Sequence, residues 1–178
     1  MSTADNREPS ARAKDIKLLA LDVDGVLSDG RVIYASDGSE LKAFNIKDGL
    51  GIKLLQRAGI TVAIITGRQS AVVGRRAAEL GITHLFEGRE DKLCALRELS
   101  ASLGLGLAEC AYMGDDLPDL SAVRAAGLGL TVADAAAEVR AAADWCSDAT
   151  GGAGAVREAC EWLLRQSGAW PDVIAEFN

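Results

Sequence analysis

Carboxylates follow two separate apolar runs of the sequence, at points where buried strands are expected to end. Asp22 and Asp24 close the run 16–25, and Asp115 follows the run 109–114. Residues two apart on an extended strand point to the same side, so Asp22 and Asp24 share one side. Three carboxylates in one crevice repel one another unless a cation lies between them, and Mg²⁺ prefers oxygen ligands of this kind. The sequence therefore predicts a magnesium site.

The same carboxylates suggest phosphoryl transfer. An oxygen of Asp22 can attack a bound phosphate in line and form an acyl phosphate. Asp24, one pleat further along, would protonate the leaving alcohol and then deprotonate water. Lys92 and Thr66 would supply positive charge and an O–H donor to the equatorial phosphate oxygens. Each short motif alone is common in turns, but their combination in this order favours catalysis over a purely structural role.

These side chains must be held by the elements that surround them. Apolar runs that predict buried strands alternate with patterns that predict helices, which is typical of a parallel sheet covered on both faces. The expected strands are 16–25, 60–66, 83–88, 109–114, 128–134 and 143–148, and the expected helices are 48–59, 70–81, 90–104, 116–127, 135–143 and 154–168. Asp48 and Ser70 are expected to cap two of these helices. Because active sites of open α/β sheets lie at the carboxyl ends of the strands, Asp22, Thr66 and Asp115 should converge there.

One segment departs from this alternation. In 31–46, two strand-like arms flank "SDGS", and Asp-Gly between such arms is a strong hairpin signal. An isolated two-stranded hairpin is marginal in water and its open edges invite pairing, so hairpins of several subunits are expected to pair. The alternative is a hairpin folded back on its own domain.

The composition sets limits on domain count and partners. The chain has 178 residues, enough for one domain, here expected over 15–168 between a disordered tail at 1–14 and a C-terminal tail at 169–178. The net charge of -7 argues against nucleic acid and anionic membrane surfaces as partners. Four cysteines without CxxC spacing and one histidine argue against a zinc site or a disulfide framework. Without a signal peptide or an apolar run of roughly 18 residues, a cytoplasmic location is expected.

The motifs together resemble a known superfamily. "LDVDGVLSDG" (21–30), "IITGR" (64–68), Lys92 in "EDKL" and "GDDLPD" (114–119) are similar to the four motifs of haloacid dehalogenase-like phosphohydrolases. Within it, residues from about 16 to 166 most resemble the 3-deoxy-D-manno-octulosonate 8-phosphate phosphatases, including the stretches 28–55, 65–88 and 151–164.

The resemblance implies a Rossmann-like three-layer α/β/α fold without a cap domain, in which a protruding β-hairpin takes the place of a lid. It implies a homotetramer whose neighbouring subunits help to close each site, with Arg76 the expected contributor to a neighbour. Asp22 would be the nucleophile and Asp24 the acid and base. Mg²⁺ would be held by Asp22, Asp115 and the backbone carbonyl of Asp24, with Asp116 and Asp119 as supporting acids.

The resemblance also implies a substrate, a phosphorylated sugar acid. Its phosphate and carboxylate would be complemented by cations. The implied contacts are Asp24, Asn45, Ile46, Lys47, Asp48, Gly49, Lys53, Arg68, Arg76 and Lys92. For Lys53 and Arg76 the alternative is an ordinary solvated helix face.

Some positions depart from the family pattern. Lys47 stands where many members have Arg, and it keeps the charge but loses the bidentate fork. Ala153 replaces an Arg that is frequent in the C-terminal glycine-rich turn. Arg68 favours an eight-carbon over a nine-carbon sugar acid, the other substrate class considered. A non-catalytic regulatory module on the same scaffold would be expected to lack Asp22 or Lys92, and both are present.

Overall fold

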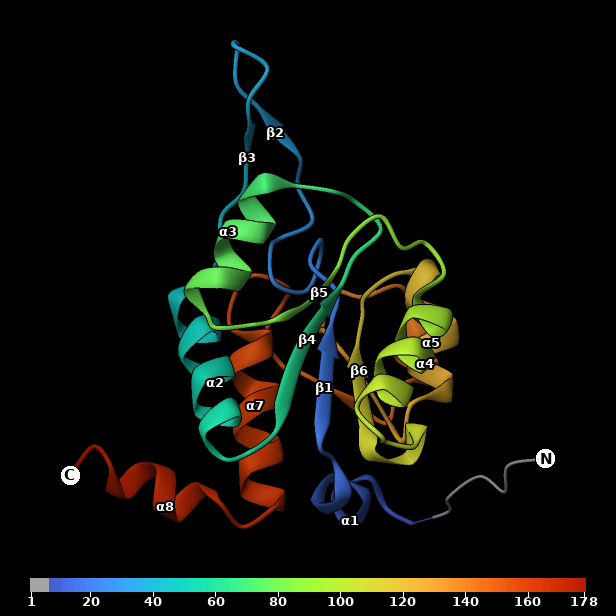
Figure 1. Ribbon diagram of the computed structural model, residues 1–178, viewed down its shortest axis with the longest axis vertical. Helices are drawn as coiled ribbons and strands as arrows, with labels where there is room; N and C mark the ends of the chain where they lie inside the picture. The colour runs from blue at the N-terminus through green and yellow to red at the C-terminus, as the bar shows by residue number, and fades with distance from the viewer. Residues whose placement is uncertain (1–6) are drawn as a thin grey trace.

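The computed structural model describes residues 7–178, and a parallel β-sheet lies at its centre (Figure 1). Its six strands lie in the order β5-β4-β1-β6-β7-β8, and every neighbouring pair is parallel. They are β1 (Leu18–Leu21), β4 (Thr61–Ile65), β5 (His84–Phe86), β6 (Cys110–Met113), β7 (Leu128–Thr131) and β8 (Trp145–Cys146). The strand that leads into Asp22 therefore lies in the middle of the sheet, with β4 and β6 on either side.

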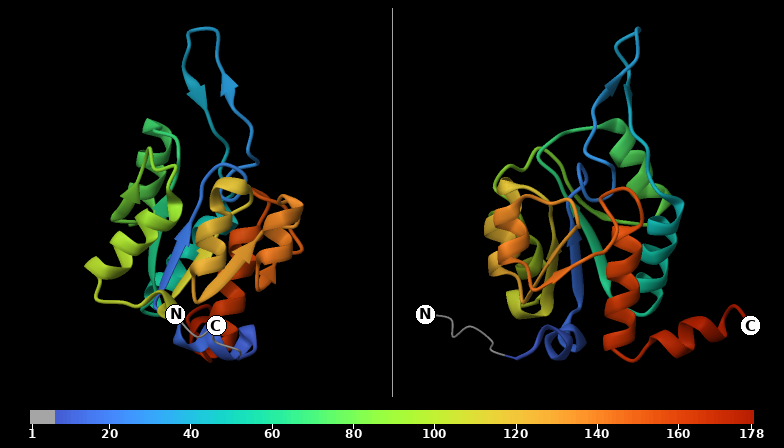
Figure 2. Two further views of the ribbon diagram at one scale, coloured as in Figure 1. Left: turned by 90° about the vertical axis from the view of Figure 1, so that its right-hand side faces the viewer. Right: turned by 180° about the vertical axis from the view of Figure 1, so that it is seen from behind.

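Helices cover both faces of this sheet, as Figures 1 and 2 show. The helices α2 (Ile46–Arg57), α3 (Ala71–Glu79) and α7 (Ala155–Gln166) form one layer. The helices α4 (Lys92–Ser102), α5 (Leu120–Ala125) and α6 (Ala137–Ala142) form the other. Short 3-10 turns precede β1, β6 and α5, at η1 (Ala13–Asp15), η2 (Leu107–Glu109) and η3 (Leu117–Asp119). The predicted three-layer α/β/α fold is confirmed.

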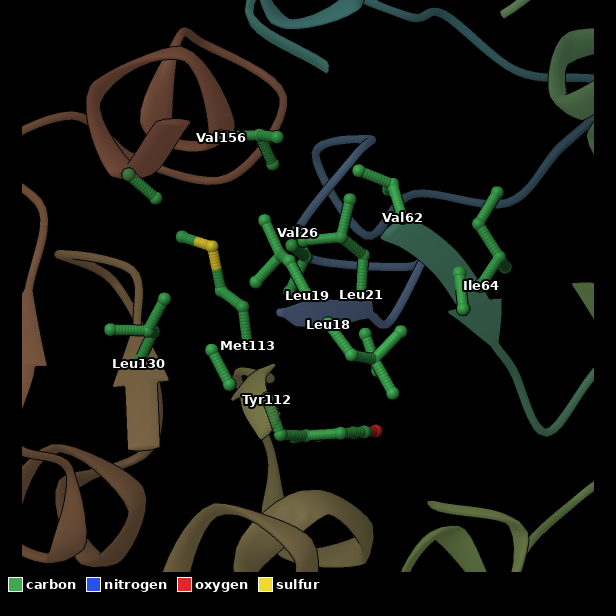
Figure 3. Packing of buried hydrophobic residues seen from close by; sticks show 14 of the residues in the cluster. Leu18, Leu19, Leu21, Val26, Val62, Ile64, Tyr112, Met113, Leu130 and Val156 are labelled. Carbon is green, nitrogen blue, oxygen red and sulfur yellow. The ribbon is translucent and has the colours of Figure 1, made fainter. Parts of the chain in front are cut away.

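The central strand is buried on both sides, which explains why its sequence is continuously apolar rather than alternating. All four residues of β1 are inaccessible to solvent. In Figure 3, Leu19 and Leu21 point toward Val156 of α7, whereas Leu18 points to the opposite side of the sheet. Burial of each such leucine side chain contributes about 1.5–3 kcal/mol, so the start of the loop that follows β1 is rigidly anchored.

The predicted hairpin is present, although its paired part is short. Strands β2 (Ile33–Tyr34) and β3 (Glu40–Leu41) pair antiparallel, with Ile33 opposite Leu41. The turn between them needs a positive φ at Gly38, where φ is +85°. The hairpin projects from the edge at which the sheet strands end (Figure 1). Among residues 7–178 nothing else rises above that edge as a separate domain, which confirms the expectation of a protruding hairpin and no cap.

The ends of the chain are more ordered than the sequence pattern indicates. Residues 1–6 of the expected disordered tail lie outside the described part, but Pro9–Arg12 forms the short helix α1. The Arg12 guanidinium donates to the Gly127 carbonyl at 2.6 Å and pairs with Asp144 at 2.5 Å. The expectation of disorder is therefore wrong for residues 9–14. At the other end, α8 (Trp170–Ala175) follows α7 and buries Val173. Within the described residues no helix has the length and apolar character needed to cross a membrane.

The helix caps differ from those expected. Helix α2 begins at Ile46, and its cap is Asn45, whose side-chain oxygen accepts from the Lys47 amide at 2.8 Å. Asp48, the expected cap, lies in the first turn and accepts instead from the backbone amide of Arg157 at 2.8 Å. It thus caps α7, a helix 109 positions further along the chain. Local spacing could not reveal this cap, because the packing of α2 against α7 creates it.

Candidate active site

A cleft of about 730 Å³ opens at the carboxyl edge of the sheet. Residues from four separate segments line it, namely Asp22, Asp24, Thr66, Arg68, Lys92, Asp115, Asp116 and Asp119. Thr66 is held there by its backbone, whose amide donates to Phe86 and whose carbonyl accepts from Arg89. The structure thus brings together every predicted catalytic and metal-binding residue.

The loop after β1 turns sharply enough to present both aspartates. The Val23 carbonyl accepts from three successive amides, those of Val26, Leu27 and Ser28, at 2.9–3.2 Å. Gly25 has a φ of +94°, and a Cβ there would lie 2.0 Å from a carboxylate oxygen of Asp115. Only glycine fits this position, because any side chain would collide with Asp115.

The glycine-rich turn before α7 supports this loop from behind. A Cβ on Gly151 would lie 1.8 Å from the Gly25 carbonyl oxygen, and the Gly152 amide donates to Val26 at 2.9 Å. The turn that carries Ala153 is therefore packed against the loop that follows β1 in the same chain.

Lys92 is a buried cation at the start of α4. Asp91 caps that helix by accepting from the Cys94 amide, which fixes the position of the lysine backbone. The Lys92 Nζ donates to Asp22 Oδ1 at 2.8 Å and to Asp119 Oδ1 at 3.0 Å. Burial alone would lower the pKa of Lys92, but the two carboxylates more than offset this and raise its pKa. Lys92 is therefore held in its charged form beside the predicted nucleophile.

Asp119 is fully engaged by donors and has no free oxygen. Its Oδ1 accepts from Lys92 and from the Tyr112 hydroxyl at 2.7 Å. Its Oδ2 accepts from the amides of Asp115 and Asp116 at 3.1 and 3.2 Å. This arrangement suits a residue that orients the site. Asp116 is exposed, and its side chain accepts from the Leu117 amide, so it acts as a cap.

The cluster of buried carboxylates can hold a cation. Oxygens of Asp22, Asp115 and Asp119 lie within 4.8 Å of one another, and Asp115 Oδ1 is buried without a hydrogen-bond partner. Burial, together with the Asp119 charge, raises the pKa of Asp22 to about 6. Burial and the Asp22 charge raise the pKa of Asp115 to about 7. An unpartnered oxygen in an all-oxygen site with excess negative charge fits a hard divalent cation such as Mg²⁺.

Asp24 lies apart from this cluster and turns toward the hairpin. Its Oδ1 accepts from the Lys42 ammonium and lies 3.4 Å from the Ser28 hydroxyl. Its Oδ2 lies 3.9 Å from Arg68 Nε. Sequence reasoning did not select Lys42. The available signal was its position two residues after Glu40, which places both side chains on one side of an extended segment.

Other predicted substrate contacts do not line this cleft. Asp48 and Gly49 are buried at the start of α2, whereas Ile46, Lys47 and Lys53 are exposed to solvent. Arg76 stacks over the Phe44 ring at 5.8 Å and lies 3.5 Å from the Asn45 carbonyl. These assignments stay predictions.

Comparison with known proteins agrees with this geometry. Residues 81–158 match the model of a haloacid dehalogenase-like hydrolase family. The chain is 48% identical over 158 residues to the 3-deoxy-D-manno-octulosonate 8-phosphate phosphatase KdsC of Escherichia coli strain K12, covering 89% of this chain and 84% of that protein.

Solved structures give the same relationship. One is a 3-deoxy-D-manno-octulosonate 8-phosphate phosphatase from Moraxella catarrhalis in complex with magnesium, phosphate and KDO, with a TM-score of 0.94, 53% identity and coverage of 96% of this chain and 98% of that one. Another is the cobalt-bound Haemophilus influenzae phosphatase, with a TM-score of 0.86, 41% identity and coverage of 89% and 93%. The chain belongs to the 3-deoxy-D-manno-octulosonate 8-phosphate phosphatase family of haloacid dehalogenase-like hydrolases.

Proposed function

We propose that this phosphatase hydrolyses 3-deoxy-D-manno-octulosonate 8-phosphate to the free sugar acid and phosphate through an aspartyl-phosphate on Asp22. The observation that carries the proposal is the position of Asp22, which lines the cleft between the buried Lys92 cation and the unpartnered Asp115 oxygen. The substrate class is supported by the names of the relatives, one of which was solved with KDO and phosphate bound.

The reaction has two steps in this proposal. In the first, a carboxylate oxygen of Asp22 forms a bond to phosphorus while the bond to the sugar oxygen breaks, and Asp24 gives its proton to that sugar oxygen. In the second, Asp24 takes a proton from water as the water oxygen bonds to phosphorus and the bond to Asp22 breaks. Lys92 Nζ, 2.8 Å from Asp22 Oδ1, and the Thr66 side chain stabilise charge on the phosphoryl oxygens.

Mg²⁺ would be held by the carboxylates of Asp22 and Asp115 and by the backbone carbonyl of Asp24, and it would neutralise charge on the phosphate. Asp119 would not be a ligand, since both of its oxygens already accept hydrogen bonds. Its role would be to hold Lys92 and the Asp115 backbone in place.

The sugar acid is recognised by cations at the cleft in this proposal. Arg68 lines the cleft with 44% of its side chain exposed, so its guanidinium is available to the substrate carboxylate. The segment 45–49, with Lys53 and Arg76, lies outside the cleft of its own subunit and would contribute to substrate binding in a homotetramer. The exposed apolar hairpin residues Ile33, Tyr34 and Leu41 support such an assembly.

Two measurements test this function. Phosphate release from a panel of eight- and nine-carbon sugar-acid phosphates should be highest for the octulosonate 8-phosphate, and a preference for another class would refute the substrate assignment. Asp22→Asn should abolish turnover and phosphoenzyme formation, whereas Asp24→Asn should slow both steps and still label with an activated aryl phosphate. Labelled phosphate on the Asp22→Asn protein would contradict the choice of nucleophile.

A further inference from the structure

Lys42 is a buried lysine that the mechanism above does not use. Only 1% of its side chain is exposed, although it lies at the base of a hairpin whose other side chains are largely in solvent. A buried ammonium is costly unless it is paired with opposite charge and hydrogen-bonded. Its partners are Asp24 Oδ1 and, at 3.3 Å, Glu40 Oε1. The pairing with Asp24 joins the hairpin to the loop that follows β1.

Glu40 extends this contact to the second cation of the cleft. Its Oε1 accepts from Arg68 at 3.1 Å and its Oε2 accepts from the Ser70 hydroxyl at 3.0 Å. Ser70 precedes α3, and its own side chain makes no cap bond to that helix. Residues 40 and 42 thus connect the end of the hairpin to Asp24, to Arg68 and to the start of α3.

The geometry points to Lys42 as a positioning residue for Asp24 in the reaction proposed above, on which this inference rests. Lys42 does not line the cleft, so it acts through Asp24 rather than on the substrate. It anchors Oδ1 and leaves Oδ2 on the side of Arg68, at 3.9 Å from Nε. Fixing one oxygen holds the other in a single orientation toward the leaving group, as efficient proton transfer requires.

This role predicts a specific dependence of the rate on the leaving group. If Lys42 orients the proton donor, its removal should lower kcat/KM most for the substrates whose leaving oxygen must be protonated. Aryl phosphates with acidic leaving groups depart without that proton, whereas alkyl phosphates do not. Loss of general folding or of phosphate binding would instead lower the rate for all esters alike. The dependence of kcat/KM on leaving-group pKa therefore separates positioning from a merely structural role.

The test compares wild type, Lys42→Met and Lys17→Met on 4-nitrophenyl phosphate, phenyl phosphate and a simple alkyl phosphate. Lys17→Met is the matched control, because Lys17 pairs with Glu109 at 2.6 Å outside the cleft. For Lys42→Met, kcat/KM should fall roughly 10- to 100-fold on the alkyl ester, within the contribution of general acid–base catalysis, and no more than about threefold on 4-nitrophenyl phosphate. Lys17→Met should match wild type on all three.

The comparison is a ratio within one protein preparation, so partial unfolding of Lys42→Met cancels. An equal loss on all three esters, or no loss on the alkyl ester, would overturn the positioning role. Failure of the proposed function looks different: wild type would show no turnover, or Asp22→Asn would retain it. Glu40→Gln keeps the Lys42–Asp24 pair and should show a weaker leaving-group effect than Lys42→Met. A stronger leaving-group effect for Glu40→Gln than for Lys42→Met would also contradict the positioning role of Lys42.

Discussion

Both carboxylate oxygens of Asp119 accept two hydrogen bonds each, so the effect of a substitution there on the free energy of unfolding can be predicted from the structure. Asn has nearly the same shape as Asp, but it replaces one acceptor oxygen with an NH₂ donor. In one amide orientation the NH₂ faces Lys92 and Tyr112, and in the other it faces two backbone amides. In either orientation Asp119→Asn therefore sets the NH₂ group against two buried donors, each of which loses its hydrogen bond to Asp119, although Lys92 keeps its bond to Asp22.

The cost follows from those two donors. A buried donor left unsatisfied costs about 1–3 kcal/mol, so two such donors set the upper limit of the gross penalty at about 2–6 kcal/mol. Removal of a charge that repels Asp22 offsets part of this. We expect a net destabilisation of about 3 kcal/mol, which lowers the Tm of a chain of this size by about 6–12 °C.

Thermal unfolding by circular dichroism in the presence of a chelator measures this loss without a contribution from metal binding. Asp116→Asn is the matched control, since the exposed Asp116 side chain caps one amide and Asn can replace it, at a cost under about 0.5 kcal/mol. Tyr112→Phe removes only one donor to Asp119, so its loss of stability should lie between those of Asp116→Asn and Asp119→Asn. An Asp119→Asn protein within about 1 kcal/mol of wild type would refute the view that four donors depend on this carboxylate.

Three further results are expected. Chelation should abolish turnover, and added Mg²⁺ should restore it; full turnover without metal would contradict the metal site. At about 100 times its Kd, Mg²⁺ should stabilise wild type against unfolding by about 2.7 kcal/mol and Asp115→Asn by much less. Burial raises the folded-state pKa of Asp48, so its contribution to stability is present below the unfolded-state pKa and is lost as pH rises through the folded-state pKa. The stability of Asp48→Asn in urea should therefore improve relative to wild type as pH rises above about 4, and a constant difference would exclude an effect of this carboxyl. Ile33→Ser with Leu41→Ser should reduce a tetramer to smaller species by light scattering while preserving hydrolysis of 4-nitrophenyl phosphate, and an unchanged tetramer would exclude assembly through the hairpin.

Local patterns in the amino-acid sequence are enough to predict the sheet, its helical layers and the residues at the strand ends. Apolar runs and helical periodicity are properties of neighbouring residues, and the carboxyl ends of parallel strands meet at one edge whatever the details of packing. For this reason Asp22, Thr66 and Asp115 can be placed together from the sequence alone. The Asp-Gly turn likewise predicts the hairpin, because a turn is encoded by adjacent residues.

The pairing of side chains across the molecule depends on the tertiary structure. Asp48 is expected to cap its own helix, but it caps α7, because α2 and α7 pack together and bring its carboxylate to a distant amide. Lys42 is not selected from the sequence at all, since its partner Asp24 lies 18 positions earlier and meets it only when the hairpin folds over the loop. The sequence places Asp119 in the acidic motif, but it does not predict the role of Asp119, because that role depends on hydrogen-bond donors from α4 and β6. Sequence patterns determine which segments fold into strands and helices, whereas the partners of buried charges depend on how distant segments pack, and that packing has no local signature.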